Sequence, residues 1–122
     1  MTPITSIQDL KTLYEQRVPR MFFDYTESGS WTEQTFRENE QKLQALTFKQ
    51  RVLVDISRRE LGSSMLGQPV SMPVALSPVG LTGFQCGDGE IKAARAAAQF
   101  GVPYTLSTMS ICSIEDVASA TD

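Results

Sequence analysis

The sequence of 122 residues contains no histidine. Imidazole is the side chain whose unperturbed pKa lies nearest neutral pH, and it is the most frequent general base in enzymes and a frequent metal ligand. A reaction that needs an imidazole must therefore take it from outside these residues, and we expect no metal site within them.

Cysteine and long apolar runs are also scarce. The two cysteines, Cys86 and Cys112, are too few for a disulfide framework or for a zinc site, which needs several ligands at short spacings. No stretch approaches the roughly 18 consecutive apolar residues of a membrane span, and the first residues lack the pattern of a signal peptide. We expect a cytoplasmic protein with reduced thiols; a peripheral position at the inner face of the membrane is the alternative.

The charges are nearly balanced. There are 11 basic and 14 acidic residues, for a net charge of −3, so no long-range positive field attracts nucleic acid. We interpret the one local basic cluster as a solvated face and expect no nucleic acid partner. This basic cluster consists of Lys49, Arg51, Arg58 and Arg59.

The first 46 residues predict three helices, each with a recognisable start. The start signals are a capping box at Thr5 and Gln8, a first-turn proline at Pro19, and a capping box at Ser30 and Glu33. The predicted helices cover residues 5–18, residues 19 to the stop at 28–29, and residues 30–46.

The rest of the chain predicts a β-α-β-α unit. Residues 51–56 are rich in β-formers, and residues 63–73 predict a short strand or a hairpin. A strand at 74–76, a helix from its cap at Asp88 to a stop at Gly101, a strand at 104–106 and a helix opened by Ser113 follow. We interpret Glu90 as a first-turn residue that complements the helix dipole.

The spacing of the two strands is typical of a parallel, right-handed crossover. A parallel sheet needs cover on both faces, which two strands and one alanine-rich helix do not supply. We therefore expect these residues to be part of a larger α/β protein.

In folds built from such units, ligands gather at the carboxyl ends of the strands. Here these ends are the first loop, residues 77–83, and the second loop, residues 107–110. Glycine in the first loop permits close approach of a flat ligand to the backbone, and the second loop offers hydroxyl groups. The alternative is ordinary turn and capping chemistry.

Five segments, in this order and spacing, resemble the family of FMN-dependent 2-hydroxy acid oxidases and dehydrogenases, most closely its bacterial flavin-type L-lactate dehydrogenases. The segments are PRMFFDYTESG, RVLVDISRRE, MPVALSPVGLTG, GEIKAARAAAQFGVPYTLSTMS and CSIEDVA. The resemblance implies bound FMN and an α/β fold, a TIM (β/α)8 barrel with an N-terminal helical extension. Residues 1–122 would then be the N-terminal part of a single domain, with the extension at 1–72 and the first two βα units at 73–122.

The resemblance also assigns two substrate-binding residues. Tyr25 matches a tyrosine whose phenol donates to the substrate carboxylate; without the resemblance it would be interpreted as a packed core tyrosine. Thr26 stands where many relatives have a second tyrosine. Met109 stands where plant glycolate oxidases have a tryptophan that lines the substrate pocket, and a flexible thioether there leaves room for a substrate larger than glycolate.

Four cofactor-binding residues follow in the same way. Pro78, Val79 and Gly80 match the loop whose backbone lies against the isoalloxazine ring, and Ser107 matches a serine that hydrogen-bonds this ring. Glycine at position 80 is common in the family's dehydrogenases and alanine in its oxidases, so we expect an electron acceptor other than oxygen.

The implied function of the full-length protein is FMN-dependent oxidation of an L-2-hydroxy acid, with L-lactate and pyruvate as the expected pair and an unidentified electron acceptor. A full barrel takes about 250 residues, so the family's catalytic histidine is expected beyond residue 122. We therefore assign no catalytic residue, expect residues 1–122 alone to be inactive, and expect a homo-oligomer, a tetramer by resemblance. One alternative is a non-catalytic truncated product that acts at most as an interaction module. Another is an FMN-binding isomerase, but the helix that carries Tyr25 argues against it.

Overall fold

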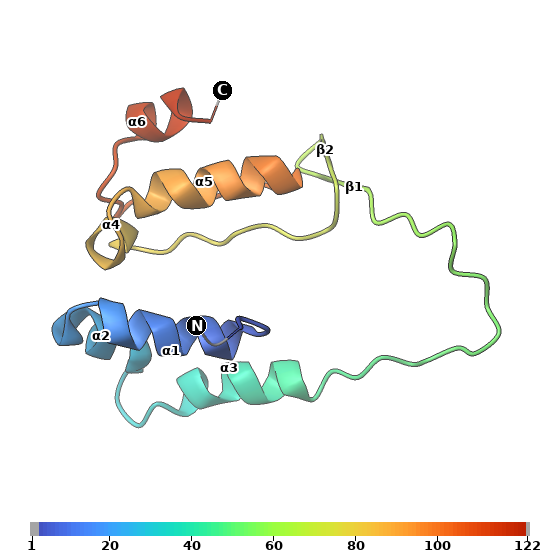
Figure 1. Ribbon diagram of the computed structural model, residues 1–122, viewed down its shortest axis with the longest axis horizontal. Coiled ribbons are helices and arrows are strands. Elements are labelled where there is room, and N and C mark those ends of the chain that lie inside the picture. The colour runs from blue at the N-terminus through green and yellow to red at the C-terminus, as the bar shows by residue number, and fades with distance from the viewer. Residues whose placement is uncertain (1–2, 122) are drawn as a thin grey trace. The chain divides into compact units, whose positions relative to one another are not determined.

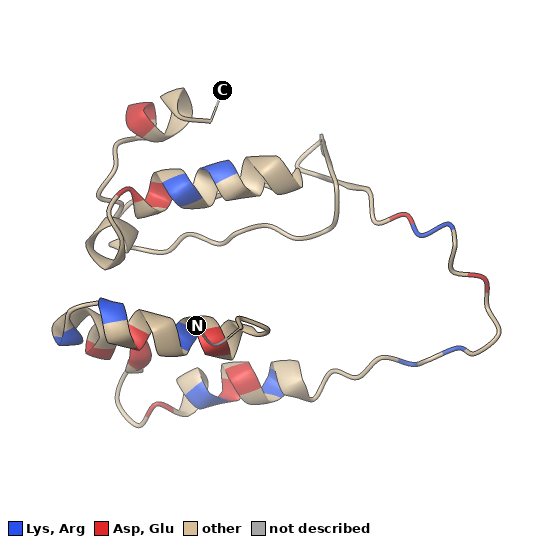
Figure 2. Ribbon diagram, viewed as in Figure 1, with Lys and Arg blue, Asp and Glu red and all other residues tan. Residues whose placement is uncertain are grey.

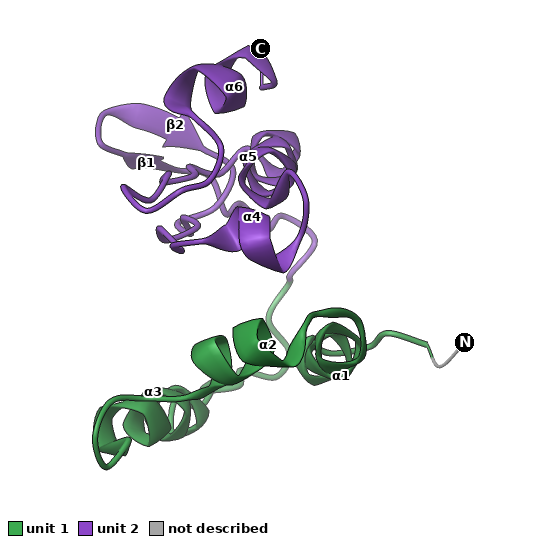
Figure 3. Ribbon diagram, turned by 90° about the vertical axis from the view of Figure 1, so that its left-hand side faces the viewer, with its two compact units in different colours: residues 1–55 green, residues 56–122 purple. Residues whose placement is uncertain are grey.

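The computed structural model describes residues 3–121 (Figure 1). The chain divides into two compact units, residues 1–55 and residues 56–122 (Figure 3). The first unit contains α1 (Ile7–Arg17), α2 (Arg20–Glu27) and α3 (Gln34–Gln44). The second contains β1 (Ser63–Met65), β2 (Gln68–Val70), α4 (Thr82–Gln85), α5 (Gly89–Phe100) and α6 (Ile114–Ser119).

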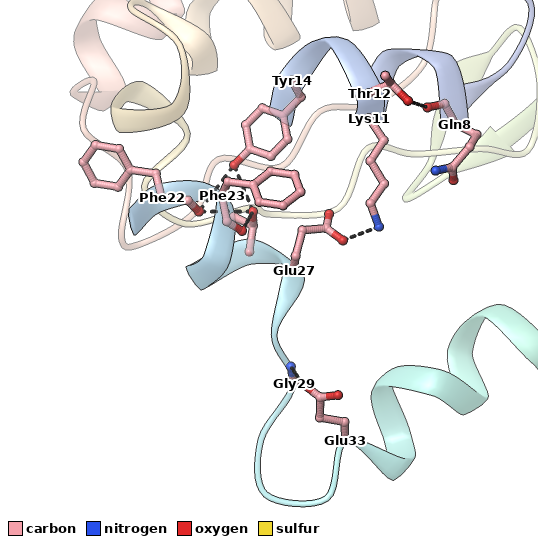
Figure 4. Close-up of polar contacts among 10 residues, drawn as sticks. Gln8, Lys11, Thr12, Tyr14, Phe22, Phe23, Glu27, Gly29 and Glu33 are labelled. Carbon is pink, nitrogen blue, oxygen red and sulfur yellow. Dashed lines mark hydrogen bonds and ion pairs between the residues drawn. The ribbon is translucent and has the colours of Figure 1, made fainter. Parts of the chain in front are cut away.

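In the first unit, α1 and α2 are joined by aromatic and polar contacts (Figure 4). The rings of Tyr14 and Phe23 lie 5.4 Å apart between centroids, and the Tyr14 hydroxyl shares a 2.9 Å hydrogen bond with Thr26 Oγ1. Lys11 and Glu27 form an ion pair beside them. None of the residues of α1, α2 and α3 is buried. These pairwise contacts, and not a closed core, therefore connect α1 to α2.

The capping box of α1 lies one residue later than predicted. The amide of Asp9 donates to Ser6 Oγ at 3.2 Å, and the amide of Ser6 donates to Asp9 Oδ2 at 2.9 Å. The predicted box of Thr5 and Gln8 is therefore wrong, although the amide and hydroxyl of Thr5 also donate to Asp9 Oδ2. Pro19 was predicted to be the first residue of the second helix; it directly precedes α2, which begins one residue later, at Arg20.

The predicted capping box at Ser30 and Glu33 does not form. Glu33 itself precedes α3 with a left-handed φ of 58°, and its Oε1 accepts a hydrogen bond from the Gly29 amide at 3.1 Å (Figure 4). The carboxylate is thus turned toward Gly29 rather than Ser30, and the helix begins only at Gln34.

The segment between α3 and the hairpin is irregular. Residues 51–56 form no strand, although they are rich in β-formers, and Leu53 adopts a φ of 60° that interrupts an extended chain. The basic cluster lies in this segment, with one acidic residue, Asp55, between its members and Glu60 directly after them (Figure 2). All four of its side chains are exposed, as expected for a solvated face.

The predicted hairpin is confirmed. β1 and β2 pair in antiparallel register, with Ser63 opposite Val70 and Met65 opposite Gln68. The two residues that join them, Leu66 and Gly67, have φ values of 52° and 78°. Positive φ at both positions is the geometry of a type I′ turn, which matches the twist of a two-residue hairpin.

The two predicted parallel strands are reduced to a single parallel bridge between Leu76 and Tyr104. The Leu76 amide donates to the Pro103 carbonyl at 2.9 Å, and the Thr105 amide donates to the Leu76 carbonyl at 3.1 Å. The parallel pairing is thus confirmed, but full strands are not formed. Each segment makes ladder bonds on one side only, which limits the length over which an extended chain is held.

The predicted start and end of α5 and the predicted start of α6 are confirmed. α5 ends at Gly101, whose left-handed φ of 66° suits glycine, and α6 begins after Ser113, whose Oγ accepts from the Asp116 amide at 3.0 Å. Asp88 does precede α5, but with a φ of 56° and without a side-chain cap, so its predicted capping role is wrong.

The buried residues of the second unit lie around α5. Its alanines Ala94 and Ala97 are buried, as are Val117 of α6 and Val70 of β2. Glu90, at the start of α5, is the one buried charged residue in the described part of the chain.

Within residues 3–121 no helix is both long enough and apolar enough to span a membrane. The same residues contain no closed barrel, so the α/β class is confirmed at the level of one β-α-β-α unit and the barrel stays a prediction.

Candidate functional site

The two loops expected to carry the ligand lie against each other in the second unit. The Leu81 amide donates to the Met109 carbonyl at 2.9 Å. A Cβ added to Gly80 would lie 3.2 Å from Met109 Cβ and 3.7 Å from Ser107 Oγ. Gly80, Ser107 and Met109, which the sequence analysis selected from separate loops, are therefore brought together.

The backbone of the first loop presents polar groups that no other described residue uses. The amides of Val79 and Gly80 donate no hydrogen bond to another residue within 3–121, and Pro78 has no amide hydrogen. The Val79 carbonyl is held by the Thr82 hydroxyl at 3.0 Å, and Leu81 turns the chain with a φ of 57°. The loop is thus fixed at its C-terminal end and open at residues 78–80.

Ser107 is half-buried and is oriented by its own loop. Its Oγ accepts a hydrogen bond from the Met109 amide at 3.1 Å, and its carbonyl accepts from the Ser110 amide at 3.1 Å. In the described region the Ser107 hydroxyl donates to no acceptor, so its proton is available to a ligand.

Met109 lies at the edge of this loop pair. Its backbone is held by Ser107 and Leu81, whereas its side chain is 62% exposed. A thioether that is fixed at the backbone and free at its end can line a pocket and adapt to the shape of a substrate.

Tyr25 belongs to the other unit, on α2, and its side chain is 64% exposed. It does not pack in a core of its own unit, so the alternative of a buried aromatic finds no support there. Its role toward the substrate carboxylate stays a prediction.

Glu90 is the residue that the sequence analysis missed. Its side chain is 0% exposed, and its Oε1 accepts hydrogen bonds from the amides of Gly83 at 2.9 Å and Ile111 at 3.1 Å. It therefore contacts both the first loop and the residue that directly follows the second loop, which a first-turn helix residue that only complements the dipole would not do. A sequence signal exists, because Gly83 and Gly89 are small residues of the kind that permit close backbone approach.

The environment of Glu90 shifts three titratable groups. Burial alone would raise the pKa of Glu90, but hydrogen bonds from the Ile111 and Gly83 amides hold it below its usual value. Burial and the adjacent carboxylate raise the pKa of the Cys112 thiol. Burial, followed by the charge of Glu90, raises the pKa of Tyr104. The carboxylate is therefore ionised and the thiol and phenol are neutral at neutral pH.

Both cysteines are free thiols. Cys86 accepts a hydrogen bond from Lys92 Nζ at 3.5 Å and is exposed. Across residues 3–121, no three or more acidic, cysteine or histidine side chains gather in a way that could hold a metal ion.

Comparison with known proteins connects this chain to a family. The family model described as FMN-dependent dehydrogenase matches residues 14–122. The chain is 44% identical over 117 residues to an L-lactate dehydrogenase of Chromohalobacter salexigens, covering 96% of this chain and 30% of that protein. It is 45% identical over 116 residues to an L-lactate dehydrogenase of Xanthobacter autotrophicus, covering 95% of this chain and 30% of that protein.

Solved structures of similar proteins agree. A soluble mutant of the membrane-associated (S)-mandelate dehydrogenase of Pseudomonas putida matches with a TM-score of 0.90 and 39% identity, over 98% of this chain and 34% of that chain. A protein of Pediococcus acidilactici described as a lactate oxidase matches with a TM-score of 0.88 and 28% identity, over 98% of this chain and 33% of that chain.

The chain spans 30% of the length of these curated relatives. The match nevertheless extends over most of the chain itself, and it confirms the resemblance inferred from the five sequence segments. The chain belongs to the family of FMN-dependent dehydrogenases.

Proposed function

We propose that these residues form one wall of the flavin and substrate site in an enzyme that oxidises L-lactate, an L-2-hydroxy acid, to pyruvate. The observation that carries the proposal is the contact of Gly80 with Ser107 and Met109, in a chain of the FMN-dependent dehydrogenase family. The L-lactate dehydrogenase names of the curated relatives support the choice of substrate.

The loop pair fits an isoalloxazine ring. Gly80 has no Cβ, and one added there would meet Met109 Cβ at 3.2 Å, so glycine lets the two loops approach this closely without a shift. The amides of Val79 and Gly80 and the hydroxyl of Ser107 are donors without an acceptor within residues 3–121, and a flavin ring offers nitrogen and oxygen acceptors along its edge. FMN, when bound, supplies the ring that takes two electrons from the substrate.

The residues of this chain then bind and orient the FMN ring and the substrate. The backbone of Pro78, Val79 and Gly80 lies against the ring and keeps water from that face. Ser107 donates its hydroxyl proton to a ring acceptor, and Met109 lines the space for the substrate side chain. Tyr25 donates its phenol proton to the substrate carboxylate.

We further propose that the full-length protein is a TIM barrel, with residues 1–72 as its helical extension and residues 73–122 as its first two βα units. The imidazole base that removes the hydroxyl proton comes from outside residues 1–122, because these contain no histidine. Residues 1–122 by themselves are therefore inactive, and the assembly expected by resemblance is a tetramer.

The proposed location is the cytoplasm or, alternatively, the inner face of the membrane. A structural neighbour at 39% identity and a TM-score of 0.90 is described as a monotopic membrane protein, which supports the peripheral alternative. Fractionation of cells that express the full reading frame distinguishes the two locations.

Steady-state kinetics of the protein expressed from its full reading frame test the substrate and the acceptor. We expect kcat/KM to be higher for L-lactate than for glycolate, and peroxide to form far more slowly than an artificial acceptor is reduced. A preference for glycolate would contradict the role given to Met109. Peroxide formation as fast as acceptor reduction would contradict the inference drawn from Gly80, and a preference for (S)-mandelate would move the substrate class to larger 2-hydroxy acids.

A further inference from the structure

The carboxylate of Glu90 is placed between the two loops of the proposed flavin site. Its Oε1 accepts from the Gly83 amide at 2.9 Å and from the Ile111 amide at 3.1 Å, although these residues are 7 and 21 positions away in the sequence. Gly83 follows Gly80 by three residues in the first loop, and Ile111 directly follows the second loop, two residues after Met109. One oxygen atom thus connects the end of the first loop to the residue after the second loop, close in sequence to Gly80 and Met109.

The packing around this carboxylate leaves no space for a side chain at Gly83 or Gly89. A Cβ on Gly83 would lie 2.6 Å from Ile111 Cβ and 3.0 Å from Glu90 Oε2. A Cβ on Gly89 would lie 2.8 Å from the Thr82 carbonyl oxygen. Two glycines therefore permit the loops to close on Glu90, which is 0% exposed.

Hydrogen bonds from backbone amides to an ionised carboxylate are shorter and stronger than those between neutral groups. Burial removes competing water, so the two bonds act against separation of the loops. The direct bond from the Leu81 amide to the Met109 carbonyl, at 2.9 Å, adds a third connection beside them. Together these contacts fix the distance between Gly80 and Ser107, which lie on opposite loops.

We propose that Glu90 is a positioning residue whose buried carboxylate holds the two loops in the register that presents Gly80 and Ser107 to the flavin. This inference rests on the proposed function for the flavin site, and it adds a residue that itself contacts neither cofactor nor substrate. Loss of the carboxylate leaves the part-buried amides of Gly83 and Ile111 without this acceptor, and the loops then separate or admit water.

The test uses the protein expressed from its full reading frame, with three variants: Glu90→Ala, Glu90→Gln and the control Glu115→Gln. Glu115 is an exposed carboxylate in the first turn of α6, so it matches the helix position of Glu90 without the burial. Glu90→Gln keeps an acceptor for the two amides but loses the charge, and its amide group must replace Oε2, which has no hydrogen-bond partner in the described region.

Two quantities are measured for each variant: the Kd for FMN, from quenching of flavin fluorescence on addition to the apoprotein, and amide hydrogen exchange of the apoprotein at Gly83 and Ile111. We expect Glu90→Ala to weaken FMN binding by about tenfold or more, consistent with the loss of charge-assisted hydrogen bonds. Exchange should accelerate at both amides, Glu90→Gln should be intermediate, and Glu115→Gln should match the unsubstituted protein.

A folded Glu90→Ala protein with an unchanged Kd for FMN would overturn the proposal. If that variant does not fold, Glu90→Gln carries the same comparison. Amide exchange in the unsubstituted apoprotein tests the proposal without any variant. The proposal requires slow exchange at the amides of both Gly83 and Ile111. Failure of the unsubstituted protein to bind FMN would instead contradict the proposed function. The exchange measurement does not use the cofactor, so it still tests the positioning role of Glu90 in that case.

Discussion

The amide nitrogen of Leu81 donates a 2.9 Å hydrogen bond to the carbonyl oxygen of Met109. This bond connects the backbones of the two loops beside Gly80, so a side chain introduced at Gly80 acts on the second loop as well as on the ligand. The predictions for the glycines of the first loop follow from this connection.

Gly80→Ala places a Cβ 3.2 Å from Met109 Cβ, which requires Met109 to move by a few tenths of an ångström. We expect a small cost in stability, about 1 kcal/mol, the low end of the range for overpacking. We also expect a larger share of turnover to produce peroxide, because alanine is common at this position in the family's oxidases. The amount of peroxide formed per pyruvate, measured in air with the full-length protein, checks this expectation. An unchanged ratio would show that Gly80 does not determine the electron acceptor.

Gly83→Ala meets harder obstacles, with Ile111 Cβ at 2.6 Å and Glu90 Oε2 at 3.0 Å. We expect a loss of about 1–3 kcal/mol in the free energy of unfolding, because neither neighbour can move without breaking the carboxylate contacts. Urea unfolding of the full-length protein measures the loss. Gly87→Ala is the matched control, since a Cβ there meets nothing within 4 Å, and equal stability of the two variants would contradict the packing described here.

The contribution of Glu90 to stability should depend on pH. Its pKa in the folded protein lies below the reference value of 4.5, so the charged form is the one that the fold stabilises. This contribution is present above 4.5 and is lost as the pH falls through the lower, folded-state pKa. The difference in free energy of unfolding between the unsubstituted protein and Glu90→Gln should therefore shrink as a pH series passes below 4.5. A difference that grows on acidification would show that the carboxylate is protonated in the fold.

The hydrogen bond of 2.9 Å between the Tyr14 hydroxyl and Thr26 Oγ1 should couple α1 to α2. A double-mutant cycle with Tyr14→Phe and Thr26→Val isolates this pair from the ring contact with Phe23, which the phenylalanine keeps. We expect a coupling free energy of about 0.5–1.5 kcal/mol, typical of an intramolecular hydrogen bond. Additive effects of the two substitutions would mean that water replaces the bond without loss.

Some features determined by neighbouring residues were predictable from the sequence. The end of α5 at Gly101 and the start of α6 at Ser113 depend on one residue and its immediate backbone, and both were predicted correctly. The start of α3 was predicted incorrectly, because the Glu33 carboxylate accepts a hydrogen bond from the Gly29 amide and not from the Ser30 amide. The strands at 74–76 and 104–106 were predicted longer than they are, since strand length depends on partners on both sides.

The candidate site follows the same division. Gly80 and Ser107 could be selected because each lies in a loop that follows a predicted strand, where ligands gather in folds of this class, and because the family resemblance points to both. Glu90 could not, because its role depends on amides 7 and 21 residues away, a relationship that no local pattern contains.

The anaerobic visible spectrum of the protein expressed from its full reading frame, recorded before and after addition of L-lactate and of D-lactate, tests the central claim most directly. The account predicts a flavin absorption band that bleaches with L-lactate and persists with D-lactate. The absence of a flavin band, or a band that L-lactate leaves unchanged, would contradict it.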